Sequence, residues 1–239
     1  MVSTVIKNWD NKNWLSSKRY ILSFNKFLIK LNKLDSNSII LDIGCGRGKI
    51  TGSLRTKLRL REKPIGIDLV DHKDKDKRIN FKKINILKFL KKNKKKFDLI
   101  LIKQTIHLLK LSEIKNLLMI SKKSLSPNGQ IMIFTLNPHK NEFPTFKLMR
   151  KELLISLKRD KKIISIISKL YPKRIQKYFS YKVEISKKKY INMIVKRFVS
   201  ILLRFDKKLI LKGINEINSK YKKYLRFNDK LICIIIKNK

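Results

Sequence analysis

Apolar residues occur in two different patterns along the chain. Short runs rich in isoleucine and leucine, separated by polar segments, are typical of the buried strands of a parallel sheet. Such runs lie at residues 39–43, 65–69, 79–86, 97–102, 131–134 and 231–236. Between the first two runs, Ile50, Leu54 and Leu58 recur at helical spacing. The pattern therefore predicts an α/β protein in which buried strands alternate with helices.

After Pro138 the apolar residues form helical stripes, which predict a long and mostly helical segment before the last strand. A helical insertion of this kind can enclose a site and exclude water. We therefore expect four regions: an N-terminal helical lid at 1–35, a ligand-binding core at 36–137, a helical cap or substrate region at 138–224, and a final strand at 225–239. The aromatic residues expected in the lid are Trp9, Trp14, Tyr20, Phe24 and Phe27.

One turn, directly after the first apolar run, holds three of the seven glycines. Gly44, Gly46 and Gly48 let the backbone adopt conformations closed to other residues and approach a ligand closely. A dinucleotide-binding fingerprint needs another glycine, but the required position is Lys49 counted from Gly44, or Thr51 counted from Gly46. The spacing therefore weakens a nicotinamide interpretation.

The segment from Leu41 to Gly48, an apolar strand with an acid followed by G-x-G-x-G, resembles the first motif of class I S-adenosylmethionine-dependent methyltransferases of the type 11-like group. Further landmarks follow in the family's order, ending with the turn at 125–130 before the fifth strand. The resemblance implies a doubly wound, mostly parallel, seven-stranded Rossmann-like sheet with an antiparallel final strand. It implies S-adenosylmethionine as the cofactor, with S-adenosylhomocysteine as the product.

The resemblance also assigns residues to the cofactor. Asp68 ends the second strand, where the family binds the ribose hydroxyls, and a carboxylate can accept from both of them. Asn85 follows the third strand, near the expected adenine. The expected cofactor-binding residues are Asp42, Gly44, Cys45, Gly46, Gly48, Asp68, Leu69, Asn85, Ile86, Lys103 and Gln104.

Composition changes the picture of possible partners. The 239 residues carry 60 Lys and Arg against 17 Asp and Glu, a formal net charge of +43. Lysine increases together with isoleucine and asparagine throughout the chain, which favours compositional drift over a dedicated nucleic-acid surface. The N-terminus lacks the apolar core of a secretory signal, and no apolar run is long enough to span a membrane, so we expect a cytoplasmic protein. The two cysteines have no metal-ligand spacing, and we expect no metal.

Methyl transfer from a sulfonium needs mainly alignment, and a carboxylate acceptor needs no base. A hydroxyl or amine acceptor needs one, and His107, after the fourth strand, is the candidate. In the cap, the spacing of Tyr190, Met193 and Arg197 predicts one helical face, where Arg197 would hold a substrate carboxylate. Tyr20 and Tyr190 complete the expected substrate contacts. The cap loosely resembles that of trans-aconitate methyltransferases, which favours an anionic acceptor.

Three functions remain open on the sequence. The first is a methyltransferase acting on a small, anionic molecule under the cap, and the second is an RNA or protein methyltransferase that uses the basic surface. The third is a cofactor-binding interaction module without catalysis. Residues 103–106 lack the Asn/Asp-Pro-Pro-Tyr/Phe motif of methyltransferases that act on planar amides or exocyclic amines. Neither cysteine lies where a cytosine-methylating nucleophile would, and the oligomeric state is not predicted.

Overall fold

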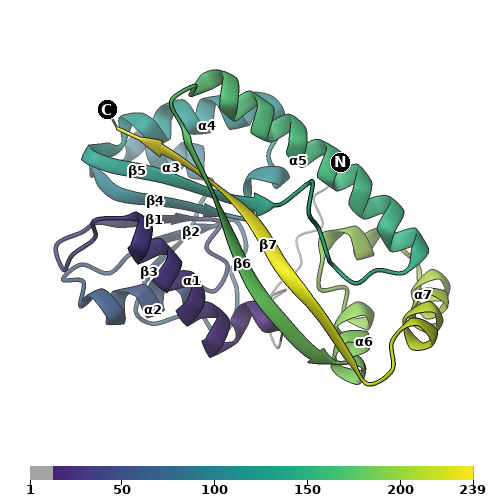
Figure 1. Ribbon diagram of the computed structural model, residues 1–239. Helices are drawn as coiled ribbons and strands as arrows, with labels where there is room; N and C mark the ends of the chain where they lie inside the picture. The colour runs from purple at the N-terminus through teal and green to yellow at the C-terminus, as the bar shows by residue number, and fades with distance from the viewer. Residues whose placement is uncertain (1–12, 239) are drawn as a thin grey trace.

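The computed structural model of the chain describes residues 13–238, in which seven strands form one sheet flanked by helices (Figure 1). The strand order is β3-β2-β1-β4-β5-β7-β6. The strands are β1 (Ile40–Ile43), β2 (Ile65–Asp68), β3 (Asn80–Lys83), β4 (Phe97–Lys103), β5 (Leu125–Leu136), β6 (Ile175–Ser186) and β7 (Tyr224–Lys237). All pairs among β1 to β5 are parallel, and β7 lies antiparallel between β5 and β6. The predicted fold class is confirmed.

Helices cover both faces of the sheet, as the strand and helix patterns require. The α-helices are α1 (Lys18–Leu31), α2 (Lys49–Leu58), α3 (Ile86–Lys92), α4 (Leu111–Lys123), α5 (Lys147–Leu170), α6 (Lys187–Val195) and α7 (Lys207–Lys220), and the short 3-10 helices are η1 (Trp14–Ser16), η2 (Ile106–Leu108) and η3 (Ser200–Arg204). One apolar cluster includes α1, and the other includes α3 and α4. The first half of α5 packs in the former cluster and its second half in the latter.

The segment expected to be a helical cap also contains a strand. Residues 175–186 form β6, which pairs along its whole length with β7, and β7 begins at Tyr224, one residue before the expected start at 225. Sequence periodicity missed β6 because its outer positions are exposed, so it carries no continuous apolar run. The fifth strand also begins earlier than expected, at Leu125, with a register irregularity between Phe97 and Leu99 where it pairs with β4.

The antiparallel pair of β6 and β7, which α6, η3 and α7 connect, extends beyond the rest of the sheet at the edge where β1 and β4 end (Figure 1). Leu136 at the end of β5 pairs with Leu231, so residues 224–230 of β7 continue past that edge with β6 alone. The helices α6 and α7 pack at the far end of this extension. The β6–β7 pair therefore forms a wall beside the carboxyl ends of the parallel strands, where α/β proteins bind their ligands.

Candidate active site

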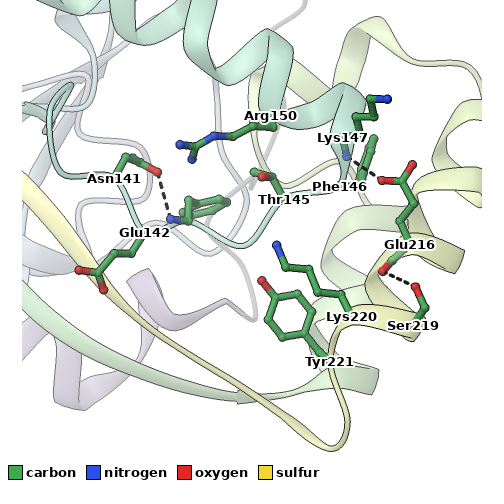
Figure 2. A pocket seen from close by; sticks show the side chains of 11 residues that line it. Asn141, Glu142, Thr145, Phe146, Lys147, Arg150, Glu216, Ser219, Lys220 and Tyr221 are labelled. Carbon is green, nitrogen blue, oxygen red and sulfur yellow. Dashed lines mark hydrogen bonds between the residues drawn. The ribbon is translucent and has the colours of Figure 1, made fainter.

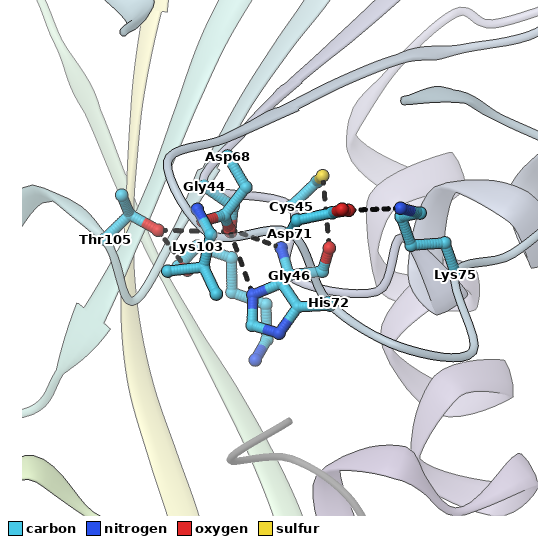
Figure 3. Close-up of polar contacts among 10 residues, drawn as sticks. Gly44, Cys45, Gly46, Asp68, Asp71, His72, Lys75, Lys103 and Thr105 are labelled. Carbon is cyan, nitrogen blue, oxygen red and sulfur yellow. Dashed lines mark hydrogen bonds and ion pairs between the residues drawn. The ribbon is translucent and has the colours of Figure 1, made fainter. Parts of the chain in front are cut away.

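The glycine turn lies at the carboxyl end of β1, against the ends of β2 and β4 (Figure 3). Gly44 and Cys45 donate their backbone N–H groups to the Ile67 carbonyl at 2.8 and 3.1 Å, which attaches the turn to β2. Thr105, just after β4, donates its hydroxyl to the Lys103 carbonyl at 3.1 Å and approaches the Gly44 carbonyl at 3.4 Å. The three strand ends that the sequence marked are thus brought together.

Glycine is required at positions 44 and 46 of the turn for different physical reasons. Gly44 and Gly46 both have positive φ, at +68° and +55°, a backbone region that favours glycine. A Cβ on Gly44 would collide with the Thr105 side chain at 2.1 Å, whereas a Cβ on Gly46 would meet no atom within 4 Å. The turn therefore packs on the protein at Gly44 and leaves open space at Gly46. That space is what a ligand lying against the turn requires.

Asp68 ends β2 and holds the glycine turn. Its carboxylate accepts from the backbone N–H groups of Gly46 and Val70, each at 2.9 Å, and lies 3.8 Å from the His72 ring. Burial would raise the pKa of Asp68, but these contacts outweigh it and hold the pKa below its usual value. The group is therefore ionised at neutral pH. It is placed, as predicted from the sequence, beside the turn that would carry a ribose.

Asp42 is buried in β1, on the same face of the sheet as Ile40. Its Oδ2 accepts from the Thr51 hydroxyl at 2.9 Å. Burial raises the pKa of Asp42 to about 7, although the Thr51 hydrogen bond and the charge of Lys103 act in the opposite direction. Its charge therefore depends on its surroundings near neutral pH, and a nearby cation would favour the ionised form.

Lys103 and Gln104 occupy the carboxyl end of β4. The Lys103 ammonium donates to Gln104 Oε1 at 3.1 Å and lies 5.4 Å from the ring centres of both Tyr20 and Phe24. Gln104 has φ +51°, which is unusual for a residue with a side chain, and its N–H donates to the Phe134 carbonyl at 2.8 Å. Such strained positions gather at functional sites. The turn after β4 therefore holds an unusual backbone conformation at the expected reacting centre.

The residues expected at the adenine lie after β2 and β3. Leu69, next to Asp68, is 60% exposed, which is high for a leucine and suits a residue that covers a flat ring. Asn85 begins α3, and its side-chain oxygen accepts from the N–H groups of Leu87 and Lys88. This capping role occupies the Asn85 oxygen. The Ile86 side chain is buried, so its contact with an adenine would be limited to its backbone.

A family model described as "Methyltransferase domain" matches residues 34–196 of the chain. The match covers the glycine turn, all the expected cofactor residues and part of the cap.

This protein belongs to the methyltransferase domain family.

The resemblance to class I S-adenosylmethionine-dependent methyltransferases is thereby confirmed, and with it the enzyme class and the cofactor.

Three solved structures with the same fold are methyltransferases. A putative methyltransferase from an antibiotic biosynthesis pathway of Anabaena variabilis has a TM-score of 0.61 at 13% identity, over 89% of this chain and 96% of that one. The plantazolicin methyltransferase BpumL in complex with S-adenosylhomocysteine has a TM-score of 0.54 at 19% identity, over 97% and 88%. A methyltransferase from Archaeoglobus fulgidus has 0.52 at 18%, over 92% and 94%. No curated protein sequence matches this chain.

The methyltransferase has His107 in η2, directly after the turn that follows β4. The Arg159 guanidinium of α5 donates to the backbone carbonyls of His107 and Leu109, at 3.2 and 2.6 Å, and attaches η2 to the cap. Burial, together with the charge of Arg159, lowers the pKa of His107 to about 4. The imidazole is therefore neutral at pH 7, but it is a weak proton acceptor. Its predicted catalytic role is untested.

The cap does not bring together the three residues that spacing placed on one helical face. The helix α6 ends at Val195, and Arg197 lies beyond it with φ +52°. The seven-residue spacing to Tyr190 therefore no longer means a shared face, and that prediction is wrong. Tyr190 is fully buried and donates its hydroxyl to the Pro144 carbonyl, so it supports the cap. Contact of either residue with a substrate stays a prediction.

The N-terminal aromatic residues divide into two groups. Trp9 lies outside the described residues. Tyr20 and Phe24 are fully buried on α1 and pack against Phe179 of β6, with ring centres 5.7 and 5.1 Å away. Trp14 packs on Phe143 and Phe227, which belong to the region beyond β5. Because α1 covers Lys103 from the sheet's face, Tyr20 lies beside the expected reacting centre, but it is fully buried and its contact with a substrate stays a prediction.

Sequence reasoning missed Asp229 of β7. This carboxylate is 3% exposed, and its Oδ2 accepts from the Trp14 indole N–H at 3.1 Å. Burial raises the pKa of Asp229, while Lys103, Trp14 and Tyr20 act in the opposite direction. The alternation from Leu225 to Leu231 contained the signal, because it places Asp229 in the inward row with Leu225 and Phe227. A buried acid in an otherwise apolar row of side chains is a candidate functional residue.

A separate hollow of about 630 Å³ lies in the cap, between the start of α5 and the end of α7 (Figure 2). Its lining includes Arg150, Lys147 and Lys220, and Glu216 accepts from the Lys147 backbone N–H at 2.7 Å. No residue of the glycine turn borders it. The hollow is therefore not the cofactor site.

Residues 13–238 contain no group of three or more His, Cys, Asp and Glu side chains arranged to hold a metal ion. Within the same range, no helix has the length and apolar character needed to cross a membrane.

Proposed function

We propose that this methyltransferase transfers the methyl group of S-adenosylmethionine to a small molecule held under the cap, with an anionic molecule as the expected class. The open space at Gly46 carries the cofactor part of the proposal, because a side chain there would meet no atom within 4 Å, with Asp42 on β1 and Asp68 at the end of β2 nearby. The cofactor is net cationic, and these two carboxylates suit it. Asp68 and Leu69 would hold the ribose and cover the adenine.

Enclosure supports a small acceptor. Beyond Lys103, α1 covers the carboxyl end of the sheet and the β6–β7 pair bounds its side. The side chains of Tyr20, Trp14 and Asp229 are therefore buried. A covered site excludes water and fits a small molecule or a narrow peptide better than a folded macromolecule. The structurally similar BpumL has been crystallised with desmethylPZN analogs, which is consistent with this class of substrate.

The cofactor assignment is tested by calorimetry with purified protein and S-adenosylmethionine. Replacing Asp68 by Ala should weaken binding by about 1.5–3 kcal/mol, the usual scale for hydrogen bonds to a charged group. A suitable control is Asp71→Ala, because Asp71 is an exposed neighbour paired with Lys75 (Figure 3). Equal affinities for the wild type and the Asp68 variant would remove the ribose assignment.

The acceptor class is tested by incubating the enzyme with methyl-labelled S-adenosylmethionine and either a deproteinised small-molecule extract or total RNA. Label should enter the small-molecule fraction, and binding to RNA should be weak and easily screened by salt, because the basic charge is dispersed. Incorporation into RNA or protein, but not into the small-molecule fraction, would favour the alternative use of the basic surface.

A further inference from the structure

Asp229 is the acidic residue of a polar cluster on the acceptor side of the reacting centre. The residues of this cluster come from five elements, namely Trp14 of η1, Tyr20 of α1, Lys103 of β4, Tyr181 of β6 and Asp229 of β7. Trp14 bonds Asp229 Oδ2, and Tyr181 is the cross-strand partner of Asp229. Tyr20 packs on Tyr181 with ring centres 5.0 Å apart and on the Lys103 ammonium at 5.4 Å. Four other elements, η1, α1, β4 and β6, thus each place a residue near Asp229.

The topology places this cluster beyond the cofactor. Leu231 pairs with Leu136, the last residue of β5. Because β7 is antiparallel to β5, Asp229, two residues before Leu231 in the chain, lies beyond the carboxyl edge of the sheet. It shares a sheet face with Lys103 and Asp42, because Leu99, Leu101 and Cys233 belong to the same apolar cluster. From the glycine turn outward, the order on this face is Asp42 on β1, Lys103 on β4 and Asp229 on β7. Lys103 is thus between the cofactor end and Asp229.

One polar group in the cluster, the Tyr20 hydroxyl, interacts with Asp229 only in an irregular geometry. The Tyr20 hydroxyl is buried without a hydrogen bond of normal geometry to the described residues, although it lies close enough to Asp229 for each to perturb the other. Burial raises the pKa of Tyr20 well above its ordinary value, so the hydroxyl keeps its proton. An unsatisfied buried hydroxyl is costly, and a heteroatom placed between Tyr20 and Asp229 would satisfy it.

We propose that Asp229 is the proton acceptor for the methyl acceptor, which therefore reacts through a hydroxyl or amine that carries a proton. The acceptor's lone pair forms the bond to the methyl carbon. The carbon–sulfur bond breaks with its electrons going to sulfur, which gives S-adenosylhomocysteine, and the acceptor's proton passes to Asp229 Oδ1. Trp14 holds the other oxygen, Tyr20 donates to the second lone pair of a hydroxyl acceptor, and the charge of Lys103 favours the ionised carboxylate.

This inference rests on the proposed function, and it replaces His107 as the base. His107 is held against α5 by Arg159 through its backbone, and its pKa is lowered to about 4, whereas burial raises the pKa of Asp229. A carboxylate acceptor is the competing case, since it would need no base at all.

The test compares the wild type with Asp229→Asn, which keeps the shape of the side chain and an oxygen for the Trp14 N–H. The probe is methyl-labelled S-adenosylmethionine with the deproteinised extract. We expect Asp229→Asn to bind S-adenosylmethionine within about threefold of wild type and to lose at least ~100-fold in turnover, as for removal of a general base. The matched control is Asp160→Asn, another buried carboxylate, which lies on α5. It should retain turnover.

The pH profile separates a base from a structural residue. Wild-type turnover should fall on the acid side as Asp229 becomes protonated. The variant Trp14→Phe removes the N–H donor and leaves the carboxylate, so this acid limb should move to higher pH. It also keeps the proposal testable if Asp229→Asn fails to fold.

Near-wild-type turnover of Asp229→Asn would overturn the proposal in favour of a carboxylate acceptor, and so would an acid limb that does not move in Trp14→Phe. Failure of the proposed function looks different, because the wild type itself would then bind no S-adenosylmethionine or label no small molecule.

Discussion

Affinity for S-adenosylmethionine should depend on pH through Asp42. This carboxylate is 4% exposed, and burial raises its pKa to about 7 in the ligand-free protein. The cofactor is net cationic, so it binds best when Asp42 carries its negative charge. Protonation of Asp42 removes that charge, so affinity should fall as the pH decreases. Asp68 does not contribute to this change, because its pKa lies below its usual value and it stays ionised.

The size of the effect follows from the ionised fraction. A group with a pKa of about 7 is about one-tenth ionised at pH 6 and about nine-tenths ionised at pH 8. If only the ionised form binds the cofactor, the apparent dissociation constant is divided by that fraction. The affinity at pH 6 should then be roughly tenfold lower than at pH 8, which corresponds to about 1.4 kcal/mol.

Calorimetry at several pH values in buffers of equal ionic strength measures this dependence. Asp42→Asn should bind more weakly at pH 8 and show little change between pH 6 and 8, because the titrating group is gone. In Asp160→Asn, where another buried acid is removed from the opposite side of the sheet, the wild-type slope should persist. A wild-type affinity that is constant from pH 6 to 8, or a slope that survives in Asp42→Asn, would refute the assignment.

Three other substitutions test the glycine turn and the base. Gly46→Val should abolish cofactor binding with only moderate loss of stability, because its side chain enters open space, whereas Gly44→Val should lower the melting temperature further by colliding with Thr105. Equal cofactor affinity for Gly46→Val and wild type would contradict a ligand at the turn. His107→Asn should change turnover by less than about tenfold at pH 7, since its pKa of about 4 leaves little driving force for proton transfer. A loss of ~100-fold, or an acid limb near pH 4 that disappears in this variant, would restore His107 as the base.

The His107 substitution also affects acid stability in a defined direction. In the unfolded chain a histidine titrates near 6.5, and in the folded protein His107 titrates near 4. The unfolded chain therefore binds the extra proton first, and the folded state loses stability as the pH falls from 6.5 to 4. His107→Asn should remove this part of the acid destabilisation, which thermal unfolding at pH 5 and pH 7 would show.

The sequence by itself determined the half of the molecule that binds the cofactor. The runs that became β1 and β4 are apolar enough to be buried on both faces, and the glycine turn between β1 and α2 lies in one short stretch of chain. Asp68 ends a strand parallel to β1, so its place beside Gly46 follows from adjacent strands ending at one edge. These features depend on residues close together in the sequence, or on the rule that adjacent parallel strands end at one edge, so the sequence pattern can predict them.

Only the tertiary structure decided the acceptor half. The strand β6 has one exposed face and gained its conformation from pairing with β7, which lies about 50 residues further along the chain. Arg197 left the expected face because α6 ended two residues earlier, and Asp229 met Trp14 across 215 residues of chain. Contacts of this kind depend on how the elements pack, and no local periodicity contains that information.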